Sequence, residues 1–525
     1  MKKDTQENNH EKLNKITEKS AGKLLKFLDV IERAGNALPH PAILFLLLTG
    51  ITILLSWIAF NSGMSAIHPI KKEAINTVNL FSIDGLHHII TDMVKNFAGF
   101  APLGSVLVAM LGFSLAEKSG LISTILRVLV LKAPKKLIVP AVLLGGVLSH
   151  TAGDVGYIIL IPLSGMVFHS VGWNPLAGIA CAFAGVSGGF AANLLLSTAD
   201  PMLSGITQEA AKIIDPSYTV SPLSNWYFMA SSSFLIVIIG TLVTNKITIP
   251  YLGEYTGDAE KTPLVKLTKL EKKGLLYAGI VFAILTSILL LGLVPAEGFL
   301  REKETFSVLN SPVLKGVVAI IFFMGSLTGL AYGFASKTFR SQSDVVNAMQ
   351  EAMATLAPYL VLVFFASQFI SFFNFSNMGM VMAVHGSDYL KDLGLGSFTL
   401  MISFIFFTCL LDLVIGSASA KWALMAPIFV PMFMLLGFAP ELTQASYRVA
   451  DSVVNIISPL MSYFPLILAF VNKFNKNAKV GTLLAMMLPY TIAFTIFWSA
   501  MIFVWMTFEL PLGPVGNLWY KLPTP

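Results

Sequence analysis

Polar and charged residues recur at helical spacing within an apolar region near the C-terminal end of the sequence. The stretch YRVADSVVNIISP places four candidate site residues at intervals of three, four and four positions: Arg448, Asp451, Asn455 and Pro459. A helix would carry all four on one face. The arginine and the aspartate, one turn apart, are expected to neutralise each other in part. The proline predicts a helix break that frees carbonyl groups to line a site.

A lysine interrupts a second apolar run, within the motif GSASAKW at residues 416–422. Small residues let the backbone approach a ligand, and their carbonyl and hydroxyl groups can replace the water around an ion. The motif therefore predicts a hairpin tip that faces a cavity inside the membrane. A lysine that extends from an ordinary loop toward the membrane surface is the alternative. The candidate residues of this tip are Ser417, Ser419, Lys421 and Trp422.

A third polar segment, AGVSGGFAANLLLSTADP, lies about 260 positions earlier in the chain. Its glycines allow close helix approach or unwinding. Asn193 offers a neutral donor and acceptor, and Asp200 is either an ion-coupling carboxylate or a helix cap. His150 and Asp154 lie in a further short polar stretch and are secondary candidates, although a lone histidine is more often structural.

These patterns do not predict an enzyme. The segment 185–189 matches G-x-S-x-G formally, but a nucleophile elbow requires a strand, a turn and a helix. The sequence has no metal-ligand cluster and no nucleophile paired with a base. Its two cysteines, Cys181 and Cys409, lie in apolar runs and suggest neither a disulfide framework nor a metal site.

The composition indicates a polytopic membrane protein. Of the 525 residues, 55% are hydrophobic and only 12% are charged, about half the charged fraction of a soluble protein. Several long stretches are nearly free of charge, and a helix needs about 20 apolar residues to cross a bilayer. The first 38 residues are basic and are interpreted as a cytoplasmic tail, of which residues 21–37 are amphipathic.

The apolar pattern predicts an all-α protein with nine transmembrane helices and two re-entrant hairpins. The hairpins are expected near residues 137–170 and 397–437. The crossings are expected near residues 39–60, 94–116, 175–198, 223–246, 274–294, 314–333, 351–376, 441–471 and 480–508. With the N-terminus in the cytoplasm, about two thirds of the 35 Lys and Arg residues fall on the cytoplasmic side. This asymmetry supports the orientation but does not distinguish a hairpin from two full crossings.

The transmembrane domain, residues 39–525, contains a weak internal repeat. A shift of 265 positions aligns Pro162 with Pro427 and Pro175 with Pro440, together with a nearby glycine and an aromatic residue. Five crossings separate the two hairpins, so the second copy is expected to enter from the opposite side. Residues 94–246 and 351–508 would then form an inverted repeat of the kind found in secondary transporters. Chance alignment is the alternative.

The polar segments resemble the p-aminobenzoyl-glutamate transporter (AbgT) family nearly end to end. The stretches that carry the resemblance are KNFAGFAPLG, AGVSGGFAANLLLSTADPMLSGIT, IGSASAKWALMAPIFVPMFMLLGFAPE and YRVADSVVNIISP. Among the members, the chain looks most similar to the MtrF type, which is linked to export of sulfonamide antimetabolites. The family's functional positions fall on Asp200, Ser417, Trp422, Arg448, Asp451 and Pro459. Lys421 occupies the variable position of the hairpin motif.

The resemblance implies a homodimer in the bacterial inner membrane that contacts lipid, binds a small-molecule substrate and has no nucleic-acid partner. We expect an ion-coupled transporter of p-aminobenzoyl-glutamate-like folate catabolites, an exporter of sulfonamides, or both. Transport would be driven by a H⁺ or Na⁺ gradient, without a cofactor. An uptake-only carrier of dicarboxylates or aminoacyl-benzoates is the first alternative, and a channel the second.

The physical chemistry of such substrates suggests a role for each candidate. Trp422 would stack on the aminobenzoyl ring, and Arg448 and Lys421 would bind carboxylates. Asn193 and Ser417 would supply neutral contacts. Asp200 and Asp451 are the candidate ion-coupling groups, because coupling requires a group that changes its charge or binds an ion.

Overall fold

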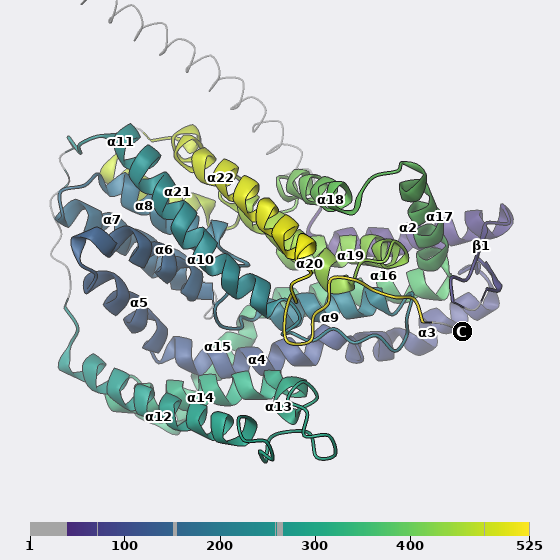
Figure 1. Cartoon of the computed structure of the whole chain (residues 1–525), viewed down its shortest axis with the longest axis horizontal. Helices are drawn as coiled ribbons and strands as arrows, with labels where there is room; N and C mark the ends of the chain where they lie inside the picture. The colour runs from purple at the N-terminus through teal and green to yellow at the C-terminus, as the bar shows by residue number, and fades with distance from the viewer. Residues whose placement is uncertain are drawn as a thin grey trace, which may run out of the picture.

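The computed structural model describes residues 39–523, apart from residues 71, 151–154, 258, 260–265 and 477. Within these ranges the regular elements are helices, apart from a small antiparallel hairpin of β1 (Ser65–Ile67) and β2 (Ala74–Asn76), in which Ala66 pairs with Ile75 (Figure 1). The prediction of a helical, polytopic membrane protein is confirmed. The basic tail, its amphipathic part and Asp154 lie outside the described residues.

Eight helical segments of the described chain are long and apolar enough to cross a membrane. Seven of them match predicted crossings, and the eighth, α19, was expected only as a hairpin arm. The segments are α2 (Pro41–Asn61), α3 (Ile83–Ala98) with α4 (Ala101–Lys118), α10 (Trp226–Val243) with the π-helical η5 (Thr244–Thr248) and α11 (Ile249–Leu252), α12 (Lys269–Leu293), α14 (Val317–Ser336), α16 (Ala357–Phe375), α19 (Ala418–Leu435) and α22 (Val480–Thr507).

A bent helix pair can be counted as a ninth span. It consists of α17 (Met378–Asp392) and α18 (Ser397–Asp412), which meet at an angle of 120°. The sequence had predicted no helix over α17, because polar residues interrupt its apolar pattern. The short helices α13 (Pro312–Lys315) and α15 (Gln342–Thr355) precede α14 and α16.

The two remaining predicted crossings, 175–198 and 441–471, are not continuous helices. The first is α8 (Pro175–Phe183), continued by the π-helical η4 (Ala184–Gly188); it then breaks and resumes as α9 (Ala199–Ala211). The second is α20 (Pro440–Asn455), which breaks at residues 456–463 and resumes as α21 (Phe464–Phe474). Glycines explain the first break, and Pro459 explains the second because proline cannot continue a helical hydrogen-bond ladder.

The two broken elements have the same register. Their first helices begin at Pro175 and Pro440, and their second helices begin at Ala199 and Phe464. Both pairs of starting points are 265 positions apart, which is the shift found in the sequence. Each broken element follows a pair of apolar arms, which helps to hold the break inside the protein.

The arms of the first pair are α6 (Ile138–Ser149) and α7 (Ile161–Ser170), the latter preceded by the π-helical η3 (Gly156–Leu160). The helices α5 (Leu121–Leu131) and η1 (Lys135–Leu137) lead into it. A Cβ atom at Gly146 would lie 2.5 Å from the backbone of Gly185, so α6 packs directly on η4. The arms of the second pair are α18 and α19.

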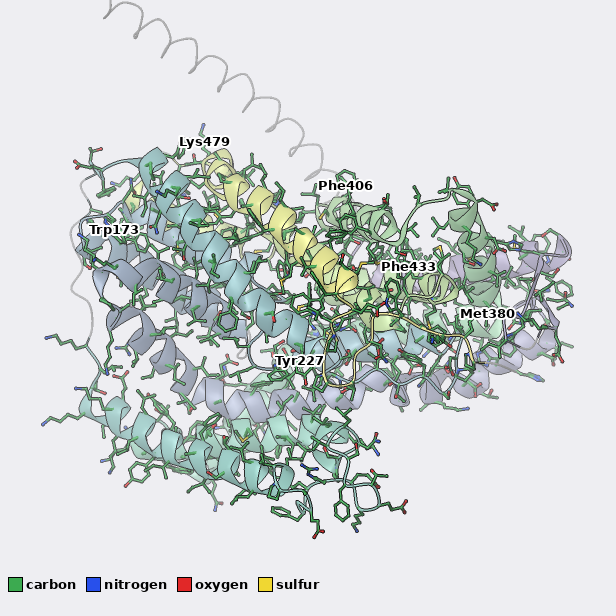
Figure 2. All side chains as sticks on the ribbon, viewed as in Figure 1. Trp173, Tyr227, Met380, Phe406, Phe433 and Lys479 are labelled. Carbon is green, nitrogen blue, oxygen red and sulfur yellow. The ribbon has the colours of Figure 1, made fainter. Side chains whose placement is uncertain are left out.

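The broken elements occupy the centre of the molecule. Helices α9 and α20 lie in the middle, α12 and α14 form the lower edge in the view of Figure 1, and α17 and the β-hairpin lie at the right. All sixteen residues of α20 are buried, although the segment contains an arginine and two carboxylates. Apolar side chains point outward from the peripheral helices, as Phe406 of α18 does in Figure 2.

Close glycine contacts hold α14 against α4. A Cβ atom at Gly329 would lie 2.4 Å from the backbone of Leu115, and one at Gly112 would lie 2.4 Å from Phe322 Cα. Gly325 and Gly329 form a G-x-x-x-G pattern on α14, which permits the backbones of two membrane helices to approach closely.

We predict that Gly329→Leu destabilises the protein by at least about 1–3 kcal/mol, because the added side chain would overlap the backbone of α4. Gly279→Leu on α12 is the matched control, since a Cβ atom there meets nothing within 4 Å. Thermal unfolding in detergent measures both variants. Equal melting temperatures for the two would show that the contact between α4 and α14 is not tightly packed.

Candidate functional site

A buried ion pair joins α20 to α9. Arg448 Nη1 lies 2.7 Å from Asp200 Oδ1, and both side chains are almost fully buried. Arg448 Nη2 also donates to the carbonyl oxygen of Ala191, at 3.4 Å, in the broken segment that precedes α9. The guanidinium group therefore contacts both the start of α9 and the unwound backbone before it.

Asp200 has hydrogen-bond donors besides the arginine. Its Oδ2 accepts from the backbone N–H of Ser197 at 2.6 Å, from the Ser197 hydroxyl at 2.9 Å and from Asn193 Nδ2 at 3.4 Å. It lies in the first turn of α9, where the helix dipole favours a negative charge. The residue thus contributes both to the local turn at the helix start and to the ion pair, while its role in ion coupling stays a prediction.

Lys421 lies between two carboxylates. Its Nζ is 2.8 Å from Asp451 Oδ1 on α20 and also contacts Asp412 Oδ1, at the last residue of α18. The three side chains are 0–3% exposed. The alternative of a lysine reaching toward the membrane surface is therefore wrong. Asp412 is likewise buried and faces the interior of the bundle.

The expected pairing of Arg448 with Asp451 is also wrong. Each of these residues pairs with a different element, Arg448 with α9 and Asp451 with the second hairpin. Helix α20 is buried on every side, so each of the two side chains can reach an opposite charge on a different neighbouring element. Helical spacing correctly predicted a charged surface, but it could not identify the partner of each charge.

Trp422 is fully buried at the contact between α19 and α9. Its indole N–H donates to Thr207 Oγ1 at 2.9 Å and to the carbonyl oxygen of Leu203 at 3.3 Å. Its ring lies 4.5 Å from the Tyr447 ring at an angle of 30°. The ring is therefore covered in this conformation, and its role in substrate binding stays a prediction.

Tyr447 is the residue that the sequence analysis missed. Its hydroxyl lies 2.5 Å from the carbonyl oxygen of Ala418 and 3.3 Å from Asp451 Oδ1, and Lys421 Nζ lies 5.7 Å from its ring centre. It contacts Trp422 and both members of one ion pair. Its position beside Arg448 in the YRVAD motif was the available signal.

The other predicted residues are less directly connected to the ion pairs. Ser417 accepts a hydrogen bond from the backbone of Ala420 at 3.4 Å and caps α19, with Ser419 Oγ at 3.4 Å. Asn455 ends α20, and Pro459 lies in the following break. His150 is buried and contacts the carbonyl oxygen of Val186, so it joins the first hairpin to η4.

A cavity of about 290 Å³ reaches the tip of the second hairpin. It lies where the break between α18 and α19 meets the break after α20 and the N-terminal end of α2. Its lining residues are Pro39, His40, Pro41, Leu44, Val414, Ile415, Gly416, Ser417, Leu460 and Ser462.

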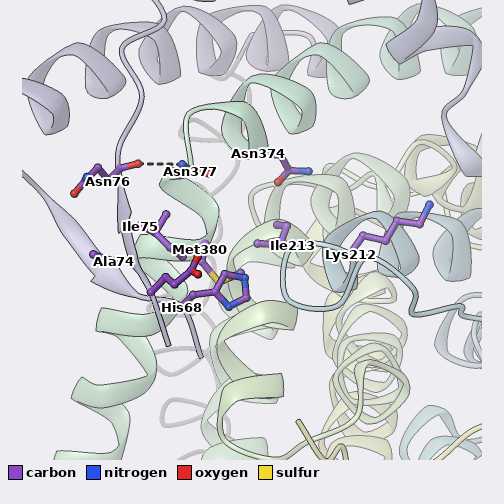
Figure 3. Close-up of a pocket in the computed structure, with 10 residues that line it drawn as sticks. His68, Ala74, Ile75, Asn76, Lys212, Ile213, Asn374, Asn377 and Met380 are labelled. Atoms are coloured by element: carbon purple, nitrogen blue, oxygen red, sulfur yellow. Dashed lines mark hydrogen bonds between the residues drawn. The ribbon is translucent and has the colours of Figure 1, made fainter. Parts of the chain in front are cut away.

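A second cavity, of about 460 Å³, lies beside the β-hairpin at the other end of α2 (Figure 3). Asn377 Nδ2 donates to the carbonyl oxygen of Asn76 across one side of it, at 3.0 Å. Its lining residues are His68, Glu73, Ala74, Ile75, Asn76, Lys212, Ile213, Asn374, Asn377 and Met380. Since α2 has 21 residues, the two cavities are separated by a helix about 30 Å long.

Comparisons with known proteins agree on one family. The model of the family described as "AbgT putative transporter family" matches residues 26–520. The p-aminobenzoyl-glutamate transport protein of Escherichia coli K12 is 39% identical over 484 residues, which cover 92% of this chain and 95% of that protein.

Two solved structures have the same fold. The YdaH transporter of Alcanivorax borkumensis is 44% identical with a TM-score of 0.87, over 91% of this chain and all of that chain. MtrF of Neisseria gonorrhoeae, described as illuminating a class of antimetabolite efflux pumps, is 48% identical with a TM-score of 0.88, over 95% of this chain and all of that chain.

We predict that the two members of the Arg448–Asp200 pair contribute unequally to stability. Asp200→Asn leaves a buried guanidinium group without a counter-charge and should cost about 3–5 kcal/mol. Arg448→Met leaves a carboxylate that keeps its Ser197 and Asn193 donors and should cost less, about 1–3 kcal/mol.

Unfolding measurements on the two single variants and the double variant give the coupling between them. Asp388→Asn, which removes an exposed ion pair with Lys391, is the control and should change little. A larger loss of stability for Arg448→Met than for Asp200→Asn would contradict the expected order.

Proposed function

Since the chain belongs to the AbgT family of transporters, we propose that it is an ion-coupled secondary transporter of aminobenzoyl compounds. Its substrates would be p-aminobenzoyl-glutamate-like folate catabolites, sulfonamide antimetabolites, or both. The chain is a multi-pass membrane protein and not an enzyme. To this established transporter family, the proposal adds the class of substrate and the coupling of transport to an ion gradient.

One arrangement of features carries this proposal. Two cavities lie at opposite ends of α2, while Trp422 and two buried ion-paired groups lie in the interior, on the broken elements and on the hairpin arms packed against them. A carrier that exposes its site to one side at a time requires a closed layer of this kind, in which packed side chains separate the two openings. Broken helices at membrane depth supply it, because their free backbone groups and helix ends can face a substrate or an ion.

The chemistry of the buried residues suits an aromatic anion. The rings of Trp422 and Tyr447 pack together beside Lys421, and an aminobenzoyl ring could stack on either once α19 and α9 separate. Arg448 has the planar donor geometry that matches a carboxylate. Sulfonamides share the aminobenzene ring and lack the glutamate carboxylates, so the aromatic contact should serve both substrates.

The equal registers of the two broken elements support an inverted repeat. We propose that residues 94–246 and 351–508 are its two copies, with nine crossings and two re-entrant hairpins. We further propose a homodimer in the bacterial inner membrane with the N-terminus in the cytoplasm. The cavity beside Ser417 would then open toward the cytoplasm, and the cavity beside Asn377 toward the opposite side.

Two alternatives make different predictions about flux. A channel would conduct without saturation and would not accumulate its substrate against a gradient. A carrier restricted to uptake of dicarboxylates would not move sulfonamides. The MtrF relative favours transport that includes sulfonamides, because the description of that protein refers to antimetabolite efflux.

We expect proteoliposomes with the purified protein to accumulate labelled p-aminobenzoyl-glutamate or sulfamethazine under an imposed H⁺ or Na⁺ gradient. Trp422→Ala should weaken the binding of both compounds, because it removes the shared stacking surface. Trp57→Ala on the exposed face of α2 is the control and should bind normally. Absence of saturable, gradient-driven accumulation by the wild-type protein would refute the proposed function.

We also predict that Ser417 and Asn377 are accessible from opposite sides of the membrane. Each would be replaced by cysteine in a background carrying Cys181→Ala and Cys409→Ala. A membrane-impermeant thiol reagent should modify the Ser417→Cys protein from the cytoplasmic side and the Asn377→Cys protein from the outer side. Modification of both from one side only would contradict the proposed positions of the cavities.

A further inference from the structure

The charges buried around Lys421 do not cancel. Two carboxylates, Asp412 and Asp451, share one ammonium group, whereas Arg448 and Asp200 balance one for one. If both carboxylates were ionised, the group would hold one excess negative charge in the interior, where an uncompensated charge is strongly disfavoured. A proton or a second cation has to complete the neutralisation.

The surroundings of the two carboxylates differ. Asp451 lies near the Tyr447 hydroxyl, at 3.3 Å, in addition to the ammonium. Among the described residues, Lys421 is the only polar partner of the Asp412 side chain. Asp412 is also the last residue of α18, and the carbonyl end of a helix disfavours a negative charge.

We propose that Asp412 carries a proton and that Asp412, Lys421 and Asp451 form the proton-coupling centre of this transporter. The proposal rests on the transport function proposed above and extends it to the identity of the ion. Lys421 supplies the positive charge between the two carboxylates that a metal cation would otherwise have to provide. One proton on a carboxylate then makes the centre electrically neutral, so the centre needs no Na⁺.

The other ionisable groups that face this centre do not change its net charge. Cys409 lies one turn before Asp412 on α18, and Tyr447 faces it from α20; both are neutral side chains at their usual ionisation. Arg448, also on α20, is paired with Asp200. Helix α22, which packs on α18 and α20, contains no Asp, Glu, Lys, Arg or His residue between Val480 and Thr507.

The cavity beside Ser417 offers a route for the proton. Val414 and Gly416, two and four positions after Asp412, line this cavity, and Ser417 begins the arm that carries Lys421. A small displacement of residues 413–417 would bring water to the carboxyl group. On loading, the carboxylate takes a proton from hydronium and leaves water; on release, the carboxyl group returns a proton to water on the opposite side.

Infrared spectroscopy of the purified protein in detergent tests the proton directly and does not depend on transport. We expect wild-type protein at neutral pH to show the C=O stretch of a buried, protonated carboxyl group. Asp412→Asn should lose this band, Asp412→Glu should shift it, and Asp388→Asn on the exposed part of α17 should retain it. A band that is unchanged in both Asp412 variants would overturn the proposal.

Proteoliposome transport tests the coupling. A gradient of about one pH unit can support about tenfold accumulation by a one-proton mechanism. Wild type and Asp388→Asn should reach this level without Na⁺, whereas Asp412→Asn should not accumulate substrate. Lys421→Met leaves two carboxylates without their cation, and its accumulation should become dependent on Na⁺.

The two readouts separate this inference from the proposed function. If the wild-type protein moves no substrate but shows the Asp412-dependent band, the proposed function fails and the assignment of the proton remains. If the wild-type protein transports substrate only with Na⁺, or if Asp412→Asn accumulates substrate in response to the pH gradient, the function holds and the assignment of the coupling centre is wrong.

Discussion

Charges buried inside a membrane protein need fixed opposite charges, and the arrangement of the broken elements follows from this requirement. Helix α20 is buried along its whole length and carries Arg448 and Asp451. Their partners cannot come from an uninterrupted apolar helix. Asp200 can pair with Arg448 because η4 ends and the new helix α9 begins beside α20. Lys421 can pair with Asp451 because it lies in the first turn of α19, just after the tip that separates α18 from α19. Each break is thus tied to α20 by a charge.

The same requirement indicates which parts of the protein should move together. Separating an ion pair in a low-dielectric interior costs far more than sliding one apolar surface over another. We therefore expect α18, α19 and α20, which are joined through Lys421, to move as one body during transport. Helices α4 and α14 are joined instead by backbone contacts at Gly112 and Gly329, which fix their distance without using charge. Helices α4 and α14 are therefore suited to form part of a fixed scaffold against which the other helices move.

The sequence predicted these features unevenly, and the reasons are physical. Apolar length identified most spans, and Pro459 and the glycines at residues 185–189 indicated where two predicted crossings break, because these signals are local. The partners of Arg448 and Asp451 were predicted wrongly, because spacing along one helix says nothing of the helices that surround it. Helix α17 was missed because its surroundings, not its own apolar pattern, stabilise it. Tyr447 was missed because most of its contacts come from α19, about 25 to 29 positions earlier in the chain.

The two cations in the centre are chemically different, and this difference suggests a division of roles. Arginine has a planar group that binds one carboxylate through two donors, whereas the lysine ammonium is a compact charge that two carboxylates can share. Asp200 keeps donors from Ser197 and Asn193 when its arginine turns away. Arg448 can therefore exchange Asp200 for a substrate carboxylate at limited cost, while loss of Lys421 from its two carboxylates would leave both exposed to each other. The first pair is suited to recognition of a substrate, and the second group to holding the coupling ion.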